Sequence, residues 1–148
     1  PPLRGWLLQT HLHLRNRNPQ LSRQKKNPVF NLFLLTNDSP IGHLHKNKSD
    51  IIHYFHSGSP ITYWVIHPDG KLEKHVLGND VSQGQVPQLI VKGDHWKASE
   101  LIEGEYGLLS EAVSPSFEYE DMELANVDTI RKQFPELFGT IKRYISQS

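Results

Sequence analysis

Apolar and polar positions alternate over short stretches along most of the chain, which is the pattern of β-strands. Residues 1–14 alternate loosely and predict an N-terminal strand, whereas residues 15–28 are polar and basic and predict a loop. The apolar run Val29–Leu35 predicts a buried strand. Further strands are predicted at even spacing over residues 41–45, 51–56, 61–67, 71–77, 87–91, 95–101 and 106–113. Because turns rich in Gly and Pro separate them, we expect segment 29–119 to form an all-β sandwich or barrel.

The C-terminal tail changes to a helical pattern. Asn126 is a good N-cap for a helix over Val127–Phe134, and Pro135 suits the first turn of a second helix over Glu136–Ile145. The apolar positions recur at helical spacing. They are Ile130, Phe134, Leu137, Ile141 and Tyr144. We therefore expect short helices over residues 126–145 that pack against the outer wall of the barrel.

The composition of the chain argues against several classes of function. The 148 residues suffice for one domain, and no apolar run reaches 18 residues, so no membrane span is predicted. Eight of the sixteen Lys and Arg residues lie in the first 50 positions, but they are interrupted by Asn and Pro and lack aromatic neighbours, so we expect no nucleic-acid partner. The absence of Cys and of a visible secretory signal favours a reducing compartment, and we expect a cytoplasmic location.

Several longer motifs stand out along the chain, namely Asn31–Thr36, Lys48–His53, His67–Leu72, Gly84–Gln88, Val91–Ala98 and Ser110–Tyr119. Together they resemble the cupin-5 group, whose members are mostly uncharacterised, and they look most like its fungal branch. The resemblance covers nearly the whole chain except the loop at 15–28. It implies a single domain over residues 1–148, built as a double-stranded β-helix (a jelly-roll barrel). It also implies a homodimer and a pocket for a small molecule in the barrel mouth.

The histidines His43 and His45 are one residue apart on a predicted strand, so their side chains should share a face. They resemble the His-x-His of the cupin metal motif, but the position of the acid, seven residues before Gly58, holds Ile51. The position of the last cupin histidine holds Trp96. We therefore predict no metal cofactor. The alternative is a divalent ion such as Fe, Ni or Zn bound by His43, His45 and a substitute third ligand.

Acid–base chemistry is the leading hypothesis. We predict that His53 and Glu111 form the catalytic pair, because a histidine near neutral pKa beside a carboxylate can move protons at working pH. The remaining predicted contacts bind the substrate through polar atoms or apolar walls. They are His43, His45, Phe55, Tyr63, Gln88 and Trp96.

These residues favour an enzyme, namely an isomerase, epimerase or cyclase in the biosynthesis of a small organic metabolite. Two alternatives stay open: a metabolite-binding cupin without chemistry, and a metal-dependent dioxygenase or lyase. It also stays open whether the histidines serve only as hydrogen-bonding groups within the barrel.

Overall fold

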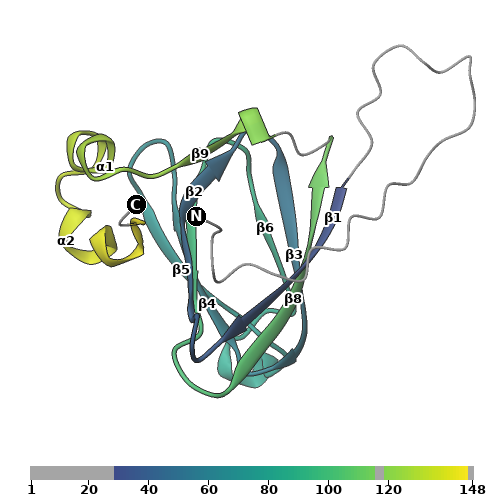
Figure 1. Cartoon of the computed structure of the whole chain (residues 1–148). Helices are drawn as coiled ribbons and strands as arrows, with labels where there is room; N and C mark the ends of the chain where they lie inside the picture. Colours follow the sequence, from purple (N-terminus) through teal and green to yellow (C-terminus); the bar gives the residue numbers. More distant parts are fainter. Residues whose placement is uncertain (1–28, 116–118, 147–148) are drawn as a thin grey trace, which may run out of the picture.

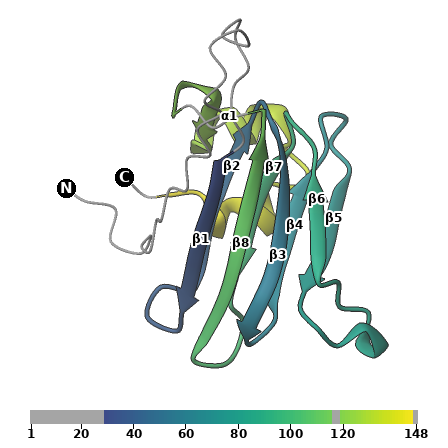
Figure 2. The same cartoon turned by 90° about the vertical axis from the view of Figure 1, so that its right-hand side faces the viewer.

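The computed structural model describes residues 29–115 and 119–146. Within these residues the strands form two antiparallel sheets that face each other (Figure 1). The four-stranded sheet contains β1 (Val29–Thr36), β8 (Tyr106–Ser114), β3 (Asp50–Gly58) and β6 (Gln88–Val91), in that order. Figure 2 looks directly onto this sheet. The expected all-β barrel is confirmed, whereas the predicted strand 1–14 and loop 15–28 lie outside the described residues.

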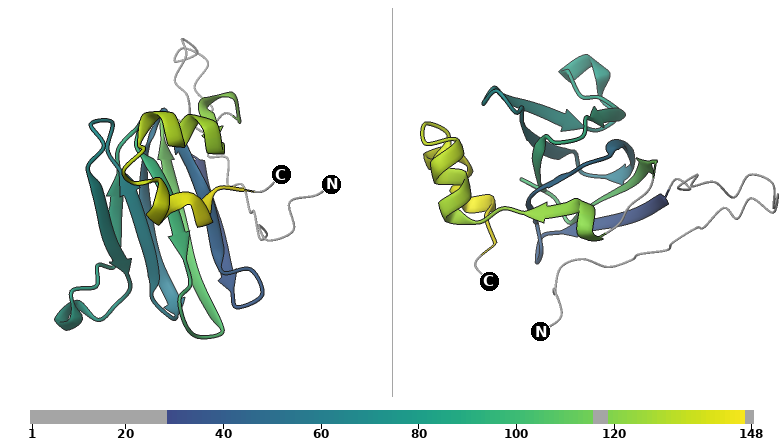
Figure 3. Two further views of the ribbon diagram at one scale, coloured as in Figure 1. Left: turned by 90° about the vertical axis from the view of Figure 1, so that its left-hand side faces the viewer. Right: turned by 90° about the horizontal axis from the view of Figure 1, so that it is seen from above.

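The second sheet has five strands among the described residues. Their order is β5 (Leu72–Leu77), β4 (Ile61–Ile66), β7 (Trp96–Glu100), β2 (Ile41–Asn47) and β9 (Met122–Leu124). The strand β9 was not predicted, because its charged sequence resembles a solvated connector. The two sheets enclose an apolar core that includes Ile61, Leu77 and Leu109, each no more than 2% exposed. The view from above in Figure 3 shows the strands curving around this interior.

The C-terminal helices cover the outer face of the five-stranded sheet (Figure 3, left). They are α1 (Val127–Gln133) and α2 (Phe138–Ile141), followed by a 3₁₀ turn over Lys142–Tyr144. The Asn126 side chain accepts a hydrogen bond from the Thr129 amide, as the N-cap motif predicts. Their apolar side chains form a second core with Leu44, Trp96 and Ala98.

The second helix is shorter than predicted. It begins at Phe138 instead of Glu136, and α-helical geometry ends at Ile141. Pro135 disfavours helical geometry at the preceding residue, so α1 ends at Gln133. Gly139 is a poor helix former in the interior of so short a segment as α2. No helix of the described residues is long and apolar enough to cross a bilayer.

Candidate functional site

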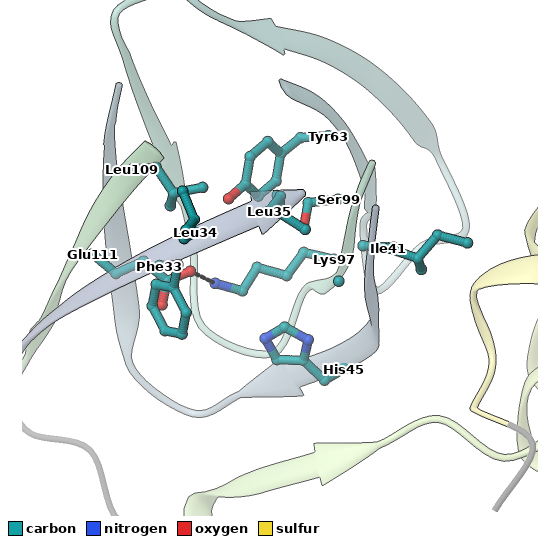
Figure 4. Close-up of a pocket in the computed structure, with 12 residues that line it drawn as sticks. Phe33, Leu34, Leu35, Ile41, His45, Tyr63, Lys97, Ser99, Leu109 and Glu111 are labelled. Carbon is teal, nitrogen blue, oxygen red and sulfur yellow. Dashed lines mark hydrogen bonds and ion pairs between the residues drawn. The ribbon is translucent and has the colours of Figure 1, made fainter. Parts of the chain in front are cut away.

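A pocket lies between the two sheets and is lined by both apolar and ionisable side chains (Figure 4). Its cavity volume is about 30 Å³, which is room for little more than one water-sized group in this conformation. The lining residues come from β1, β2, β4, β7 and β8. They are Phe33, Leu34, Leu35, Ile41, Gly42, His45, Tyr63, Lys97, Ala98, Ser99, Leu109 and Glu111.

Strand β7 supplies a lysine to this pocket. Trp96 and Ala98 face the helices, so Lys97 and Ser99, at the alternate positions, face the barrel interior. The Lys97 side chain is only 2% exposed, and Figure 4 shows it reaching across the pocket toward Glu111. A buried lysine is uncommon unless it is paired, so its partners define the site.

Those partners are the predicted pair His53 and Glu111. The two residues are opposite each other in the β3–β8 register, and His53 Nε2 lies 2.9 Å from Glu111 Oε1. Lys97 Nζ lies 2.7 Å from His53 Nε2 and 3.0 Å from Glu111 Oε1. The sequence therefore predicted two members of a buried cluster of three, which we call the Lys97–His53–Glu111 cluster.

Hydrogen bonding assigns the protons in this cluster. His53 Nδ1 lies 3.2 Å from the carbonyl oxygen of Leu89, and a carbonyl can only accept, so Nδ1 carries a proton. In the neutral ring Nε2 is then an acceptor and receives a hydrogen bond from the Lys97 ammonium. The same ammonium donates to Glu111. The cluster thus holds one positive and one negative charge beside a neutral imidazole.

The pKa shifts of the three side chains agree with this assignment of protons. Burial and the neighbouring Lys97 lower the pKa of His53, which is fully buried. Burial also lowers the pKa of Lys97, although Glu111 opposes that shift. Burial alone would raise the pKa of Glu111, but the Lys97 ammonium beside it holds that pKa well below its usual range.

His45 and Tyr63 add neutral polar groups to the pocket. His45 Nδ1 donates a hydrogen bond of 2.7 Å to the carbonyl oxygen of His43. Burial, assisted by Lys97, lowers the pKa of His45 from 6.5 to about 4, so the ring is neutral at pH 7. The buried Tyr63 ring lies 4.8 Å from that of His53, and burial together with Glu111 raises the pKa of Tyr63 well above 10.0.

The structure separates His43 from His45, contrary to the prediction. A β-bulge interrupts the β2–β7 register, because Gly42 pairs with Ser99 whereas His45 pairs with Lys97. The extra residue breaks the alternation of side chains, so His45 faces the pocket while His43 turns to the helices. There its Nδ1 lies 3.3 Å from the carbonyl oxygen of Tyr144.

Two other predicted contacts, Trp96 and Gln88, do not line the described pocket. Trp96 is buried, but in the second core between the sheet and the helices, because it has the opposite parity to Lys97 on β7. Gln88 is exposed, since its neighbour Leu89 is the β6 residue that faces inward. Phe55 packs against the interior core but does not line the described pocket, whereas Tyr63 does.

Sequence reasoning missed Lys97 and Ser99. The signal that could have found them is the alternation on the predicted strand 95–101. Once Trp96 is assigned to the outer face, the lysine beside it must face inward. A lysine on the inner face of a strand buried on both sides requires a carboxylate partner, and Glu111 was already a candidate.

Comparison with known proteins gives the same family as the motifs. The family model described as Cupin superfamily (DUF985), Cupin_5, matches residues 2–125. An uncharacterized protein of Saccharomyces cerevisiae, YML079W, is 42% identical over 93 residues, which is 60% of this chain. The chain covers 46% of that relative's length.

Solved structures agree on the fold. Protein SO0799 of Shewanella oneidensis superposes with a TM-score of 0.81 at 26% identity, covering 95% of this chain and 86% of its own. A hypothetical protein of Leishmania major gives a TM-score of 0.78 at 23% identity, covering 96% and 88%. Oxalate decarboxylase of Bacillus subtilis gives a TM-score of 0.56 at 14% identity, covering 84% of this chain and 32% of its own. This likeness shows the fold alone. With its family model matched over most of its length, the chain belongs to the Cupin_5 family of the cupin superfamily.

Proposed function

We propose that this chain is a small-molecule-binding cupin that moves protons on a small organic metabolite without a metal ion, as an isomerase, epimerase or cyclase. The observation that carries the proposal is the Lys97–His53–Glu111 cluster at the pocket wall. Glu111 lines the pocket and is ionised, so it is the base that reaches the ligand. His53 lies behind it and accepts or returns protons through Nε2.

The inner side chains do not suit a divalent metal ion. In residues 29–115 and 119–146, no three His, Asp or Glu side chains converge in a way that would hold one. His43, one half of the expected ligand pair, faces the helices. The Lys97 ammonium already contacts both His53 and Glu111, and a second cation there would be repelled. These donors support chemistry in which the fixed cation is an ammonium group.

Solvent-exchange NMR tests the proposal. Chelator-treated protein in D₂O is incubated with hydroxyacetone or glyceraldehyde, and loss of the proton next to the carbonyl is followed. We expect exchange above the buffer rate in the wild type and a decrease of about 100-fold in Glu111→Gln, since a positioned base contributes roughly 10²–10⁴. The matched control is Glu123→Gln, which removes a carboxylate that is half exposed and paired with Lys46.

Two outcomes would reject the proposal: exchange that persists in Glu111→Gln, or exchange that appears only after a divalent metal is added. A bound ligand that is recovered without exchange in the wild type would instead favour the binding module without chemistry.

We also propose that the chain forms a homodimer. The support is the family resemblance together with the position of β1, which is an edge strand among the described residues and pairs along one side with β8. The outermost strand of a sheet is a common site of association. Sedimentation velocity at micromolar concentration should give twice the 17.0 kDa mass of the chain, and a monomer under these conditions would contradict the proposal.

A further inference from the structure

We propose that Lys97 is a nucleophile that forms a protonated imine with a small neutral aldehyde or ketone bound in the pocket. This inference rests on the proposed proton-transfer function and names its substrate class and its covalent step. Among the residues that line the described pocket, Lys97 is the one Lys or Arg side chain. It enters from β7, and its amino group ends beside Glu111 in the middle of the pocket (Figure 4).

An imine requires a neutral amine, and the cluster offers a route for the proton. His53 Nε2 is an acceptor 2.7 Å from Lys97 Nζ, because the ring proton sits on Nδ1 facing Leu89. Transfer of one proton from Lys97 to His53 leaves a neutral amine and an imidazolium 2.9 Å from the Glu111 carboxylate. The charge inside the barrel is unchanged by this transfer, so no charge is created in the interior.

The covalent step balances without any other reagent. The Lys97 amine attacks the carbonyl carbon, so a C–N bond forms as the C=O π bond opens. The oxygen takes one proton from the attacking nitrogen and a second from His53 Nε2, and it leaves as water. The product is a protonated imine that keeps the positive charge of the ammonium beside Glu111. Glu111 can then remove the proton from the neighbouring carbon, which the imine has acidified.

The charge of the pocket selects a neutral ligand. Lys97 and Glu111 compensate each other, and His45 is neutral at pH 7. A ligand carboxylate would therefore add an uncompensated charge in the interior, which is costly. The cavity volume of about 30 Å³ restricts the ligand to the smallest carbonyl compounds, and the lining side chains must move apart to admit even glycolaldehyde or hydroxyacetone.

Exposed lysines of the same chain serve as internal controls. Lys71 and Lys92 also pair with carboxylates, namely Glu73 at 2.7 Å and Asp50 at 2.8 Å, but both side chains are more than 60% exposed. Both ion pairs lie at the surface, although Glu73 also contacts His67 and His75. A difference in labelling rate between Lys97 and these two lysines therefore reports the buried cluster, and not ion pairing alone.

Reductive trapping tests the inference. Wild-type protein at pH 7 is incubated with glycolaldehyde or hydroxyacetone and sodium cyanoborohydride, and modified lysines are mapped by peptide mass spectrometry. We expect Lys97 to be labelled at least ten-fold faster than Lys71 and Lys92, and this preference to vanish in urea. Lys97→Arg should lose the fast label, whereas Lys92→Arg should retain it. Equal labelling of all lysines, or labelling of exposed lysines alone, would overturn the inference. Because the labelled lysines are mapped in the wild-type protein, this result does not depend on whether a variant folds.

The trapping experiment tests the imine, and the exchange experiment separately tests the proton transfer. Exchange of the proton next to the carbonyl without a label at Lys97 would overturn the imine and leave proton transfer by Glu111 standing. A fast label at Lys97 without exchange would support the imine and overturn the proposed isomerase chemistry.

Discussion

At the scale of single residues, the fold depends on a lysine that is buried between a carboxylate and a neutral histidine. Lys97 is 2% exposed and Glu111 is 13% exposed in their side chains, so solvent does little to screen their attraction. Removing one partner of such a pair leaves the other charge buried and uncompensated. Stability and the proposed chemistry therefore depend on the same ammonium group.

Lys97→Met should lower the free energy of unfolding by about 3–5 kcal/mol, because Glu111 would lose its partner in the interior. Chemical denaturation measures the change. The double variant Lys97→Met/Glu111→Gln should recover part of the loss, since no buried charge remains. The surface control Lys92→Met, which breaks an exposed pair with Asp50, should cost less than about 1 kcal/mol. A loss in Lys97→Met no larger than in this control would contradict the buried ion pair.

His45 gives the stability a pH dependence. Its pKa is about 4 in the folded chain against 6.5 in the unfolded one, so between these values the unfolded chain binds more protons. The free energy of unfolding should therefore fall as the pH is lowered from 6.5 to 4, by up to about 3 kcal/mol from this residue. The lowered pKa of His53 acts in the same direction.

Denaturation curves at several pH values measure this slope. His45→Gln keeps an amide donor for the His43 carbonyl but does not titrate, so its slope between pH 4 and 6.5 should be shallower. His56→Gln, at an exposed position, should keep the wild-type slope. An unchanged slope in His45→Gln would show that the ring is not held neutral by burial.

At the scale of elements, the bulge in β2 decides which histidine enters the pocket. Strict alternation would have placed His43 and His45 on one face, and the extra residue between Gly42 and His45 prevents it. Gly42 faces Ser99 at the start of the bulge, and an added Cβ would collide with the Ser99 hydroxyl. The absence of a side chain at residue 42 thus allows β2 and β7 to approach beside the pocket.

Gly42→Ala should lower the free energy of unfolding by about 1–3 kcal/mol, as expected for overpacking. In Gly42→Ala/Ser99→Ala the colliding hydroxyl is gone, so the double variant should be more stable than the sum of the single effects predicts. A double-mutant cycle from denaturation curves measures the coupling. Gly139→Ala in α2 is the control, because a Cβ there meets nothing within 4 Å. Strict additivity at residues 42 and 99 would contradict the close approach.

Much of the fold was predictable because most strands obey simple alternation. On β3, His53 faces inward together with Ile51, and its register with β8 brings it to Glu111, as predicted. The bulge in β2 could not be predicted, since nothing in the sequence around Leu44 marks an extra residue. Trp96 was assigned to the pocket by family position, although its neighbour Lys97 has the inward parity. The catalytic roles of His53 and Glu111 stay predictions.

At the scale of the whole molecule, the protein has two separate cores on either side of the five-stranded sheet. The inner core surrounds the pocket, and the outer core joins the sheet to the helices. Glu100 at the end of β7 connects the five-stranded sheet to the C-terminal segment. It accepts a 2.7 Å hydrogen bond from Tyr144 and pairs with Arg143. Lys97, on the same strand, belongs to the inner layer.

This division predicts that the outer layer can be weakened without changing the site. Tyr144→Phe should lower the free energy of unfolding by about 1–2 kcal/mol, since the partly desolvated Glu100 loses a donor but keeps Arg143. The solvent-exchange rate of a bound carbonyl compound should stay within about two-fold of the wild type. A large decrease of that rate at temperatures where the variant is folded would show that the helices take part in the pocket.

The protonation state of His53 tests the whole account most directly, and ¹⁵N-resolved NMR of the histidine side chains measures it without a substrate. We predict a neutral ring at pH 7 with its proton on Nδ1 and an acceptor Nε2, beside a charged Lys97. An imidazolium at this pH, or a ring with its proton on Nε2, would contradict the assignment on which both the proton transfer and the imine depend.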